Sequence, residues 1–262
     1  WKEHFDYLLP FFKDDRYIKL DGKPIFMIYR PELIDCMDEM LACWKRWAKE
    51  NGLPGIYVIC ANCAVNAWVE VDARYIQEFN YSYSIDVAPT AKAVSWDKGV
   101  LTYDYDVLWE NLINRQYDID EKVYLGACVN FDCTPRHGTK GNIVIGATPE
   151  KFARYFEELC KRSIRRNNEY VFINAWNEWG EGMHLEPDEK NETAYLEAVK
   201  GALSNANRDY KKLAFQKDQK QGAHAEESVS LEKYIYACER DRKFTSYFNL
   251  FDSWFNAREE NR

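Results

Sequence analysis

Short apolar runs alternate along the chain with longer segments in which apolar residues recur every three or four positions. Asp21-Gly22, a dipeptide that favours a tight hairpin turn, stands between two strand-like runs, and the second of these covers residues 25–29. Further apolar runs cover residues 56–60, 123–129 and 170–174. Uninterrupted runs of this kind are typical of strands buried on both faces of a parallel sheet, and we expect such strands here.

Helical periodicity fills the intervals between these runs. It is seen over residues 1–9, 36–48, 71–79, 104–115 and 194–203. Thr148-Pro149-Glu150 has the residues preferred at a helix start: a capping hydroxyl, a proline at the first helical position and an acid in the first turn. We expect the helix that begins there to end near residues 165–168.

Strands that alternate with helices of ten to fifteen residues indicate an α/β fold of repeated βα units with parallel strands. The pattern predicts about five units. A doubly wound sheet and a (β/α)8 barrel of the TIM type are both built in this way, and periodicity alone does not choose between them.

The character of the chain changes after residue 205. Residues 211–227 are polar and are expected to form a linker or a long exposed connection, whereas residues 231–238 and 244–255 have the pattern of amphipathic helices. We therefore divide the chain into residues 1–205, the repeated βα units, and residues 206–262, a polar linker with a helical tail.

Composition narrows the class of protein. The 262 residues are 46% apolar and 30% charged, which is typical of a globular chain. The formal charge of −8 argues against a nucleic-acid partner, because such partners require a basic surface. No run of about 18 apolar residues is present, so we expect no transmembrane segment. Because Trp1 already stands inside a helical pattern, we expect the sequence to be part of a longer protein.

Eight cysteines are too few for a disulfide scaffold in a chain of this length, so a reducing, cytoplasmic location is expected. Cys60-Ala-Asn-Cys63 has the form of half a zinc site or a redox motif. Zinc would need a second pair, and Cys128 and Cys133 are more widely spaced, without a nearby pair of histidines. We interpret Cys60 and Cys63 as two unrelated thiols and expect no metal and no cofactor.

The stretch that follows the apolar run ending at Asn174 contains the largest group of candidate catalytic and substrate-binding residues. Within eleven residues it places Trp176, Asn177, Glu178, Trp179, Glu181, His184 and Glu186. The carboxyl ends of parallel strands are where active sites lie in βα folds. Indole faces stack on the apolar faces of sugar rings, and two carboxyls in different surroundings can divide into a proton donor and a base. Glycosidic chemistry needs that division.

A structural interpretation of the same residues stands beside this one. Pairs of glutamates are common on solvated loops, and tryptophan-rich turns often belong to a core. The density of interacting side chains after a strand favours the functional interpretation. His184 fits a substrate contact and a structural role equally well, and Glu186 is the residue more typical of a loop anchor.

Three ordered motifs resemble a known family. They are Asp15-Arg-Tyr-Ile-Lys-Leu-Asp-Gly-Lys-Pro-Ile-Phe-Met-Ile-Tyr-Arg-Pro31, Phe131-Asp-Cys-Thr-Pro-Arg136, and Phe172-Ile-Asn-Ala-Trp-Asn-Glu-Trp-Gly-Glu-Gly182 with Leu185-Glu-Pro-Asp188. Their sequence is similar to that of the WbsX-like glycosyltransferases of bacterial surface-polysaccharide gene clusters. These in turn resemble glycoside hydrolase family 99, the endo-α-mannosidases and endo-α-mannanases. The resemblance covers residues 1–203. It implies a (β/α)8 barrel of which this chain carries the last five units, with three strands upstream of Trp1.

The resemblance also implies catalytic roles. Glu181 would be the general acid/base at the glycosidic oxygen, and Glu178 would act as a base on the 2-hydroxyl of the sugar. The intermediate would be a 1,2-anhydro sugar, and the anomeric configuration would be retained. This differs from the usual retaining scheme, in which one carboxylate is the nucleophile.

Four more residues are candidates for substrate contact. Asp132 and Arg136 would bind sugar hydroxyls, or Arg136 would pair with Asp132 and hold the loop. Tyr29 and Arg30, at the end of the 25–29 strand, have the same two interpretations. The sequence has Phe131-Asp-Cys133 where Trp-Asp-Asn is commoner in the resembled family, which changes an aromatic and a polar side chain. Trp176, Trp179 and Tyr29 are the expected sugar platforms.

We interpret the chain as part of a glycosyltransferase of O-antigen or capsule biosynthesis that takes an oligosaccharide or polysaccharide substrate and a possible sugar donor. The alternatives are a retaining endo-glycoside hydrolase and a non-catalytic glycan-binding barrel. The sequence has no glycine-rich phosphate loop after a strand. Asp104-Tyr-Asp106 has the form of a metal-binding Asp-x-Asp motif, but it opens a helical pattern, where acids are common.

Overall fold

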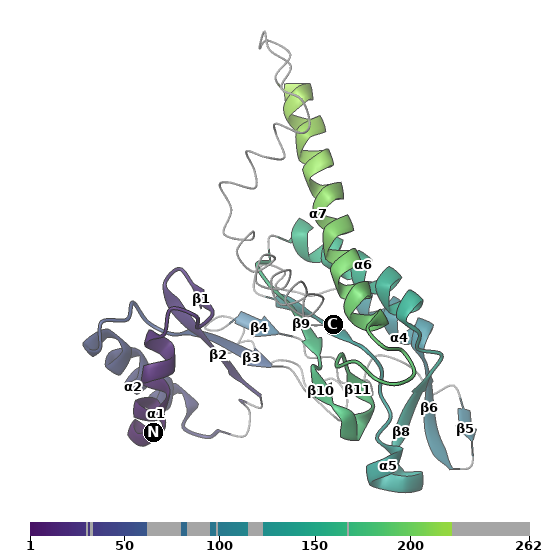
Figure 1. Cartoon of the computed structure of the whole chain (residues 1–262). Coiled ribbons are helices and arrows are strands. Elements are labelled where there is room, and N and C mark those ends of the chain that lie inside the picture. The colour runs from purple at the N-terminus through teal and green to yellow at the C-terminus, as the bar shows by residue number, and fades with distance from the viewer. Residues whose placement is uncertain are drawn as a thin grey trace, which may run out of the picture.

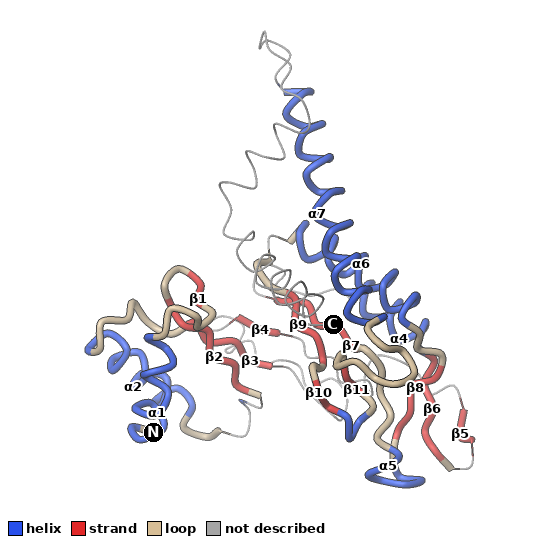
Figure 2. Tube along the Cα trace, in the orientation of Figure 1, coloured by secondary structure: helices blue, strands red, loops and turns tan. Residues whose placement is uncertain are grey.

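The computed structural model of the chain describes residues 1–29, 31, 34–61, 80–82, 95–97, 99–114, 123–166 and 168–221 (Figures 1 and 2). The helices are α1 (Lys2–Lys13), α2 (Met37–Glu50), α4 (Tyr105–Asn114), α5 (Thr134–His137), α6 (Pro149–Arg165) and α7 (Ala194–Gln221), with 3-10 turns η3 (Gly138–Lys140) and η4 (Trp179–Glu181). The strands are β1 (Lys19–Leu20), β2 (Lys23–Ile28), β3 (Tyr57–Ala61), β4 (Asn80–Ser82), β5 (Ser95–Asp97), β6 (Val100–Asp104), β7 (Val123–Cys128), β8 (Asn142–Ile145), β9 (Val171–Asn174), β10 (Asn177–Glu178) and β11 (Met183–His184).

The main sheet has the strand order β1-β2-β3-β4-β7-β9. β1 and β2 form the antiparallel hairpin predicted around Asp21-Gly22, and both turn residues have the positive φ that a tight two-residue hairpin requires. β2, β3, β4, β7 and β9 are all parallel, so the four strands predicted over residues 25–29, 56–60, 123–129 and 170–174 are confirmed, and β4 is a fifth strand that the sequence did not place.

Strand order decides how these units are wound. Each parallel strand lies beside the next parallel strand along the chain, without the reversal that creates the switch point of a doubly wound sheet. This is the order found in (β/α)8 barrels. The described strands do not close into a barrel, because β1 and β9 stand at opposite edges of the sheet.

A second sheet, β5-β6-β8, is absent from the sequence prediction. β6 lies between β4 and α4, and β8 lies between β7 and α6, so both belong to segments that leave the carboxyl edge of the main sheet. The two strands are parallel neighbours, with Leu101 opposite Asn142 and Asp104 opposite Ile145 (Figure 2). This pairing joins the connections that follow two adjacent strands of the main sheet.

The core has two parts. Phe5 and Phe12 of α1 and Trp44 of α2 are buried against β2, and a larger cluster unites α4, α6 and α7 with β7 around Trp109 and Phe152. Aromatic rings account for much of each cluster, including the stacked pair of Trp109 and Tyr155.

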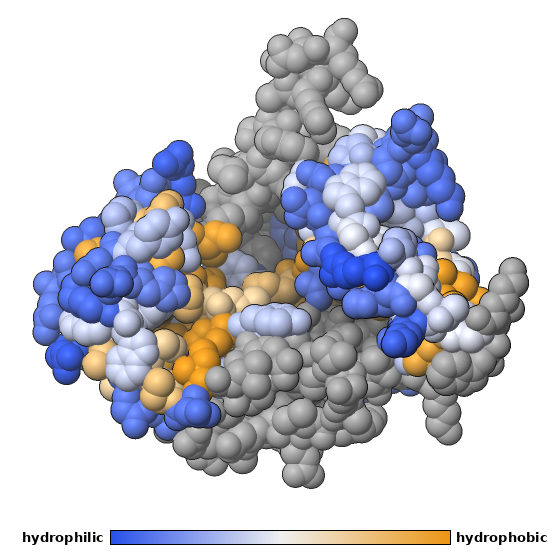
Figure 3. Space-filling view, turned by 90° about the horizontal axis from the view of Figure 1, so that it is seen from below, coloured by the Kyte–Doolittle hydropathy of each residue, from blue (hydrophilic) through white to orange (hydrophobic). Residues whose placement is uncertain are grey.

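The strand at residues 25–29 is not buried on both faces. Ile28 lies in the core formed with the helices, whereas Met27, on the opposite face, is 39% exposed. On the face that Figure 3 shows, hydrophilic residues cover much of the described surface, and a group of hydrophobic residues lies near the middle. The expectation of two covered faces is therefore wrong for β2.

The last helix is longer than predicted. It begins at Ala194 as expected but continues to Gln221, through residue 205 and the first part of the segment expected to be a linker. Figure 1 shows α7 extending beyond the rest of the fold.

The described part of the chain contains no helix long and apolar enough to cross a bilayer. The helices predicted over 71–79, 231–238 and 244–255 and the Cys60/Cys63 side chains lie outside the described residues.

The cap of α6 provides a test of the predicted helix start. The Thr148 Oγ1 accepts a hydrogen bond from the backbone N–H of Lys151 at 3.2 Å. Thr148→Ala is expected to lower the free energy of unfolding by about 1 kcal/mol, and Thr148→Ser, which keeps the acceptor, is expected to lower it by much less. Urea unfolding of the three proteins measures the difference. Equal losses in the two variants would contradict this role of the hydroxyl.

Candidate active site

The candidate site forms where the connections after β7 and β9 meet. These strands are neighbours in the main sheet, with Cys128 opposite Asn174, so the chain leaves both at the same edge. The backbone N–H of Val129 donates to the Asn174 carbonyl at 3.1 Å. The connection after β7 carries Asp132 and, on α5, Arg136, and the connection after β9 carries the carboxylate and indole motif.

The motif after β9 folds as a small hairpin. Asn177 pairs with His184 and Glu178 with Met183, and η4 forms the turn between β10 and β11. Gly182 ends that turn with φ 58°, a conformation that side chains with a Cβ rarely adopt. Met183 and Leu185 are buried in the larger core cluster and anchor the hairpin to the fold. The two glutamates therefore stand at either end of one tight turn.

Arg136 joins the two glutamates. Its Nη2 donates to Glu178 Oε1 at 3.1 Å, and its Nη1 donates to Glu181 Oε1 at 3.2 Å. The side chains are 50%, 46% and 30% exposed for Arg136, Glu178 and Glu181, so the group remains open to solvent. A Cβ at Gly180 would lie 2.3 Å from Arg136 Nη2. Glycine at this position leaves room for the guanidinium between the carboxylates.

Asp132 is bonded to the start of α5 and to the Glu181 backbone rather than to Arg136. Its Oδ1 accepts hydrogen bonds from the backbone N–H and the hydroxyl of Thr134, at 2.9 and 2.6 Å, at the start of α5. The Asp132 N–H donates to the Glu181 carbonyl at 2.7 Å, which ties the two connections together. The alternative in which Arg136 pairs with Asp132 is thus replaced by its pairing with Glu178 and Glu181.

Trp179 has one covered face and a fixed orientation. Its ring stacks on His184 with centroids 3.7 Å apart, and its Nε1 donates to Glu186 Oε2 at 2.6 Å. The indole is nevertheless 49% exposed. His184 and Glu186, both candidates for substrate contact, hold the Trp179 ring in this orientation.

Asp188 supports His184 and was not selected from the sequence. Its Oδ2 lies 3.2 Å from His184 Nε2, and its carboxylate accepts hydrogen bonds from Asn191 and from the N–H of Lys190. Burial opposes ionisation of Asp188, but the bonds from Asn191, His184 and Lys190 outweigh it and lower the pKa of the carboxyl. The sequence signal is the i, i+4 spacing of His184 and Asp188.

The remaining candidates are placed differently. Trp176 and Asn177 are exposed at the start of the hairpin, beside the glutamates. Tyr29 follows β2 at the same edge of the sheet and is 63% exposed, but three strands separate β2 from β9. Arg30 lies outside the described residues. Among the candidates that the structure describes, all except Tyr29 lie around this one hairpin.

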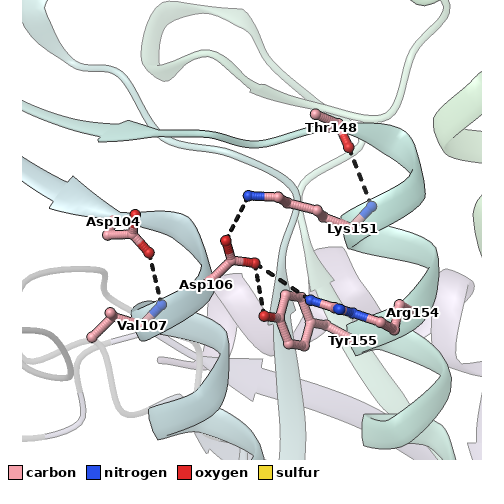
Figure 4. Close-up of polar contacts among 7 residues, drawn as sticks. All are labelled: Asp104, Asp106, Val107, Thr148, Lys151, Arg154 and Tyr155. Atoms are coloured by element: carbon pink, nitrogen blue, oxygen red, sulfur yellow. Dashed lines mark hydrogen bonds and ion pairs between the residues drawn. The ribbon is translucent and has the colours of Figure 1, made fainter.

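The Asp104-Tyr-Asp106 motif lies at the start of α4, and both carboxylates are engaged there (Figure 4). Asp104 Oδ1 accepts from the Val107 N–H at 3.0 Å, as expected of a helix cap. Asp106 pairs with Lys151 at 2.5 Å and Arg154 at 3.5 Å and accepts from the Tyr155 hydroxyl at 2.7 Å. Among the residues that the structure describes, no group of three or more His, Cys, Asp or Glu side chains is arranged to hold a metal ion.

This cluster joins α4 to α6. The Lys151 ammonium holds the pKa of Asp106 below its usual value, burial opposes that effect, and the Tyr155 hydroxyl adds to it. Burial, with the hydrogen bond to Asp106, raises the pKa of Tyr155 to about 12. The motif thus has a structural use in the fold.

Three comparisons relate the chain to known proteins. The family described as "Glycosyltransferase WbsX" matches residues 1–199. Two proteins of Xanthomonas campestris pv. campestris, both named "Uncharacterized protein WxcX", are 28% and 27% identical over 206 and 208 residues. These matches cover 75% of this chain and 29% of each relative, so the chain spans less than a third of their length.

Solved structures with a similar arrangement include a GH99 endo-alpha-mannosidase from Bacteroides thetaiotaomicron. The similarity has a TM-score of 0.45 at 17% identity and covers 80% of this chain and 62% of that one. The same enzyme in complex with BIS-TRIS-propane gives a TM-score of 0.46 at 16% identity, covering 80% and 66%.

The Asp106 cluster can be tested with a matched pair of variants. Asp106→Asn is expected to lower the free energy of unfolding at pH 7 by about 1 kcal/mol, since charged hydrogen bonds are lost at a partly solvated site. Asp104→Asn removes the same charge but keeps a helix cap, so it should cost little. Equal losses in the two variants would contradict the assignment.

The same pair predicts a pH dependence. Because the pKa of Asp106 is lowered by folding, its contribution is present above the unfolded value of about 3.9 and is lost as the pH falls through the folded value. The difference between wild type and Asp106→Asn should therefore shrink below about pH 4. Urea unfolding from pH 7 to pH 3 measures it. A difference that stays constant over this range would contradict the ion-pair account.

Proposed function

The chain belongs to the WbsX glycosyltransferase family, and from this premise we propose that it carries the two catalytic carboxylates of an enzyme that acts at a glycosidic centre. The observation that carries the proposal is the hairpin after β9, on which Glu178 and Glu181 share one guanidinium beside two exposed indoles. Carboxylate pairs at the carboxyl edge of a parallel sheet suit proton transfer on a bound sugar.

In the proposed mechanism Glu181 is the general acid/base at the glycosidic oxygen, and Glu178 removes the proton of the 2-hydroxyl. The sugar oxygen O2 then bonds to C1 as the leaving oxygen departs with the Glu181 proton. An acceptor opens the resulting 1,2-anhydro sugar from the opposite face, so the anomeric configuration is retained overall. The short turn between the two glutamates supports a concerted role for them.

Exposed aromatic faces provide the sugar platforms in this proposal. Trp179 offers one indole face, since His184 covers the other, and Trp176 lies 41% exposed nearby. Asn177 is exposed on the same strand as Glu178 and is proposed to bind a sugar hydroxyl. Tyr29 and Arg30 are proposed to contact the substrate from β2.

The proposed function has two versions, which differ in the acceptor: a glycosyltransferase uses a sugar, and a glycoside hydrolase uses water. Membership of the family favours a glycosyltransferase of surface-polysaccharide biosynthesis. The motif chemistry fits a retaining endo-glycoside hydrolase equally well, because the same intermediate reacts with either acceptor. The engagement of Asp104 and Asp106 in the fold argues against a metal-bound nucleotide sugar at that motif. Release of reducing ends from oligosaccharides without any donor would establish the hydrolase.

We propose the finer architecture on the same basis. The five parallel strands are the last five of a (β/α)8 barrel, which the unreversed strand order supports. In this proposal residues 1–205 form this part of the barrel, and residues 206–262, which begin within α7, form the tail. The activity and substrates of the whole protein remain part of the proposal, since the chain spans 29% of its WxcX relatives.

Substitution of the glutamates tests the proposal. In the full-length protein, Glu181→Gln and Glu178→Gln are each expected to lower kcat on an oligosaccharide substrate by about 10²–10⁴-fold, the usual contribution of a general acid or base. Glu189→Gln, an exposed glutamate of the same connection, is the control and should keep full turnover. Turnover is followed by chromatography of the products, with and without sugar donors.

Two outcomes would overturn the proposal. Turnover within a few-fold of wild type in both variants would remove the glutamates from catalysis. Unchanged glycan affinity with no turnover under any condition would instead indicate a glycan-binding barrel, which has no need of a carboxylate pair.

A further inference from the structure

Arg136 is the cation that the structure places between the two proposed catalytic carboxylates. Its two terminal nitrogens bond to different glutamates, at 3.1 Å to Glu178 and 3.2 Å to Glu181. The three side chains come from two connections that the Asp132 N–H and the Glu181 carbonyl hold together. One guanidinium therefore contacts both carboxyl groups at this turn.

The proposed reaction moves a negative charge from one of these carboxylates to the other. Before the step Glu178 is ionised and Glu181 carries the proton. During the step the 2-hydroxyl proton passes to Glu178, the O2–C1 bond forms, the bond from C1 to the leaving oxygen breaks, and the Glu181 proton passes to that oxygen. Afterwards Glu178 is neutral and Glu181 is ionised, so the ionised partner has changed while the total charge has not.

We propose that Arg136 is the common counter-ion for this exchange: a positioning residue that stays bonded to whichever glutamate is ionised. The inference rests on the proposed function and adds a role that a substrate-binding arginine would not have. A fork of N–H donors held between two acceptors can keep its position while the charge moves, so little reorganisation is needed during the step.

The surroundings of Arg136 fit this role. Arginine is always charged and presents its donors in a rigid plane, whereas lysine is a single point charge that would favour one glutamate. Gly180 leaves the space that the guanidinium occupies, since a Cβ there would lie 2.3 Å from Nη2. Asp132 Oδ1 accepts hydrogen bonds from the N–H and the hydroxyl of Thr134, the first residue of the helix from which Arg136 extends.

The first experiment measures turnover in the full-length protein with the oligosaccharides used above. Arg136→Gln is expected to lower kcat by about 10- to 100-fold with little change in KM, and Arg136→Lys should lie between this variant and wild type. Lys140→Gln is the matched control, because it removes an exposed positive charge in η3, four residues after Arg136 in the sequence. A raised KM with normal kcat in Arg136→Gln would overturn the proposal and make Arg136 a substrate contact.

The second experiment needs no substrate, so it separates this inference from the proposed function. Glu178→Gln and Glu181→Gln mimic the two protonation states, and NMR of the Arg136 guanidinium reports whether its rotation is restricted. Separate Nη signals are expected in wild type and in both single variants, and an averaged signal in the double variant. Release of the guanidinium in wild type or in either single variant would overturn the proposal, even if the glutamates prove catalytic.

Discussion

The bonds from Arg136 to Glu178 and Glu181 are the interaction on which the candidate site depends. They connect Arg136 to two residues that lie 42 and 45 positions further along the sequence. They can form only because β7 and β9 are neighbours and parallel, so that their following connections leave the sheet at one edge. The strand order thus brings the two connections together, and the side chains of Arg136, Glu178 and Glu181 then form the contacts between them.

Local backbone geometry makes the contact possible. Gly180 leaves space for the guanidinium, and Gly182 turns the hairpin in a left-handed conformation close to the Asp132 backbone. Gly141 also lies against α5, where a Cβ would come within 2.9 Å of Thr134 Cα. The second sheet holds this connection from the other side, since β8 pairs with β6. Packing within the fold therefore explains why glycine stands at positions 141, 180 and 182, without any reference to a substrate.

The sequence predicted the parts of the fold that local patterns determine. The Asp21-Gly22 hairpin, the Thr148 cap and the parallel strands follow from turn chemistry, capping and continuous apolar runs. The short strands β5, β6 and β8 were missed because three to five residues carry too little periodicity, and the pairing of β6 with β8 joins distant segments. The extension of α7 beyond residue 203 was missed because the polar sequence there resembles that of a linker.

The sequence selected most of the side chains that the structure brings together around this hairpin, but not the contacts between them. Clustering along the chain was enough to select Glu178, Glu181 and Trp179, whereas the partner of Arg136 depends on how two connections pack and cannot be read from spacing. The roles assigned to Glu178 and Glu181 imply one stereochemical outcome, which NMR of the first product formed from an anomerically pure oligosaccharide tests most directly. Retention of the anomeric configuration is predicted for either acceptor. An inverted product would contradict the roles assigned to Glu178 and Glu181.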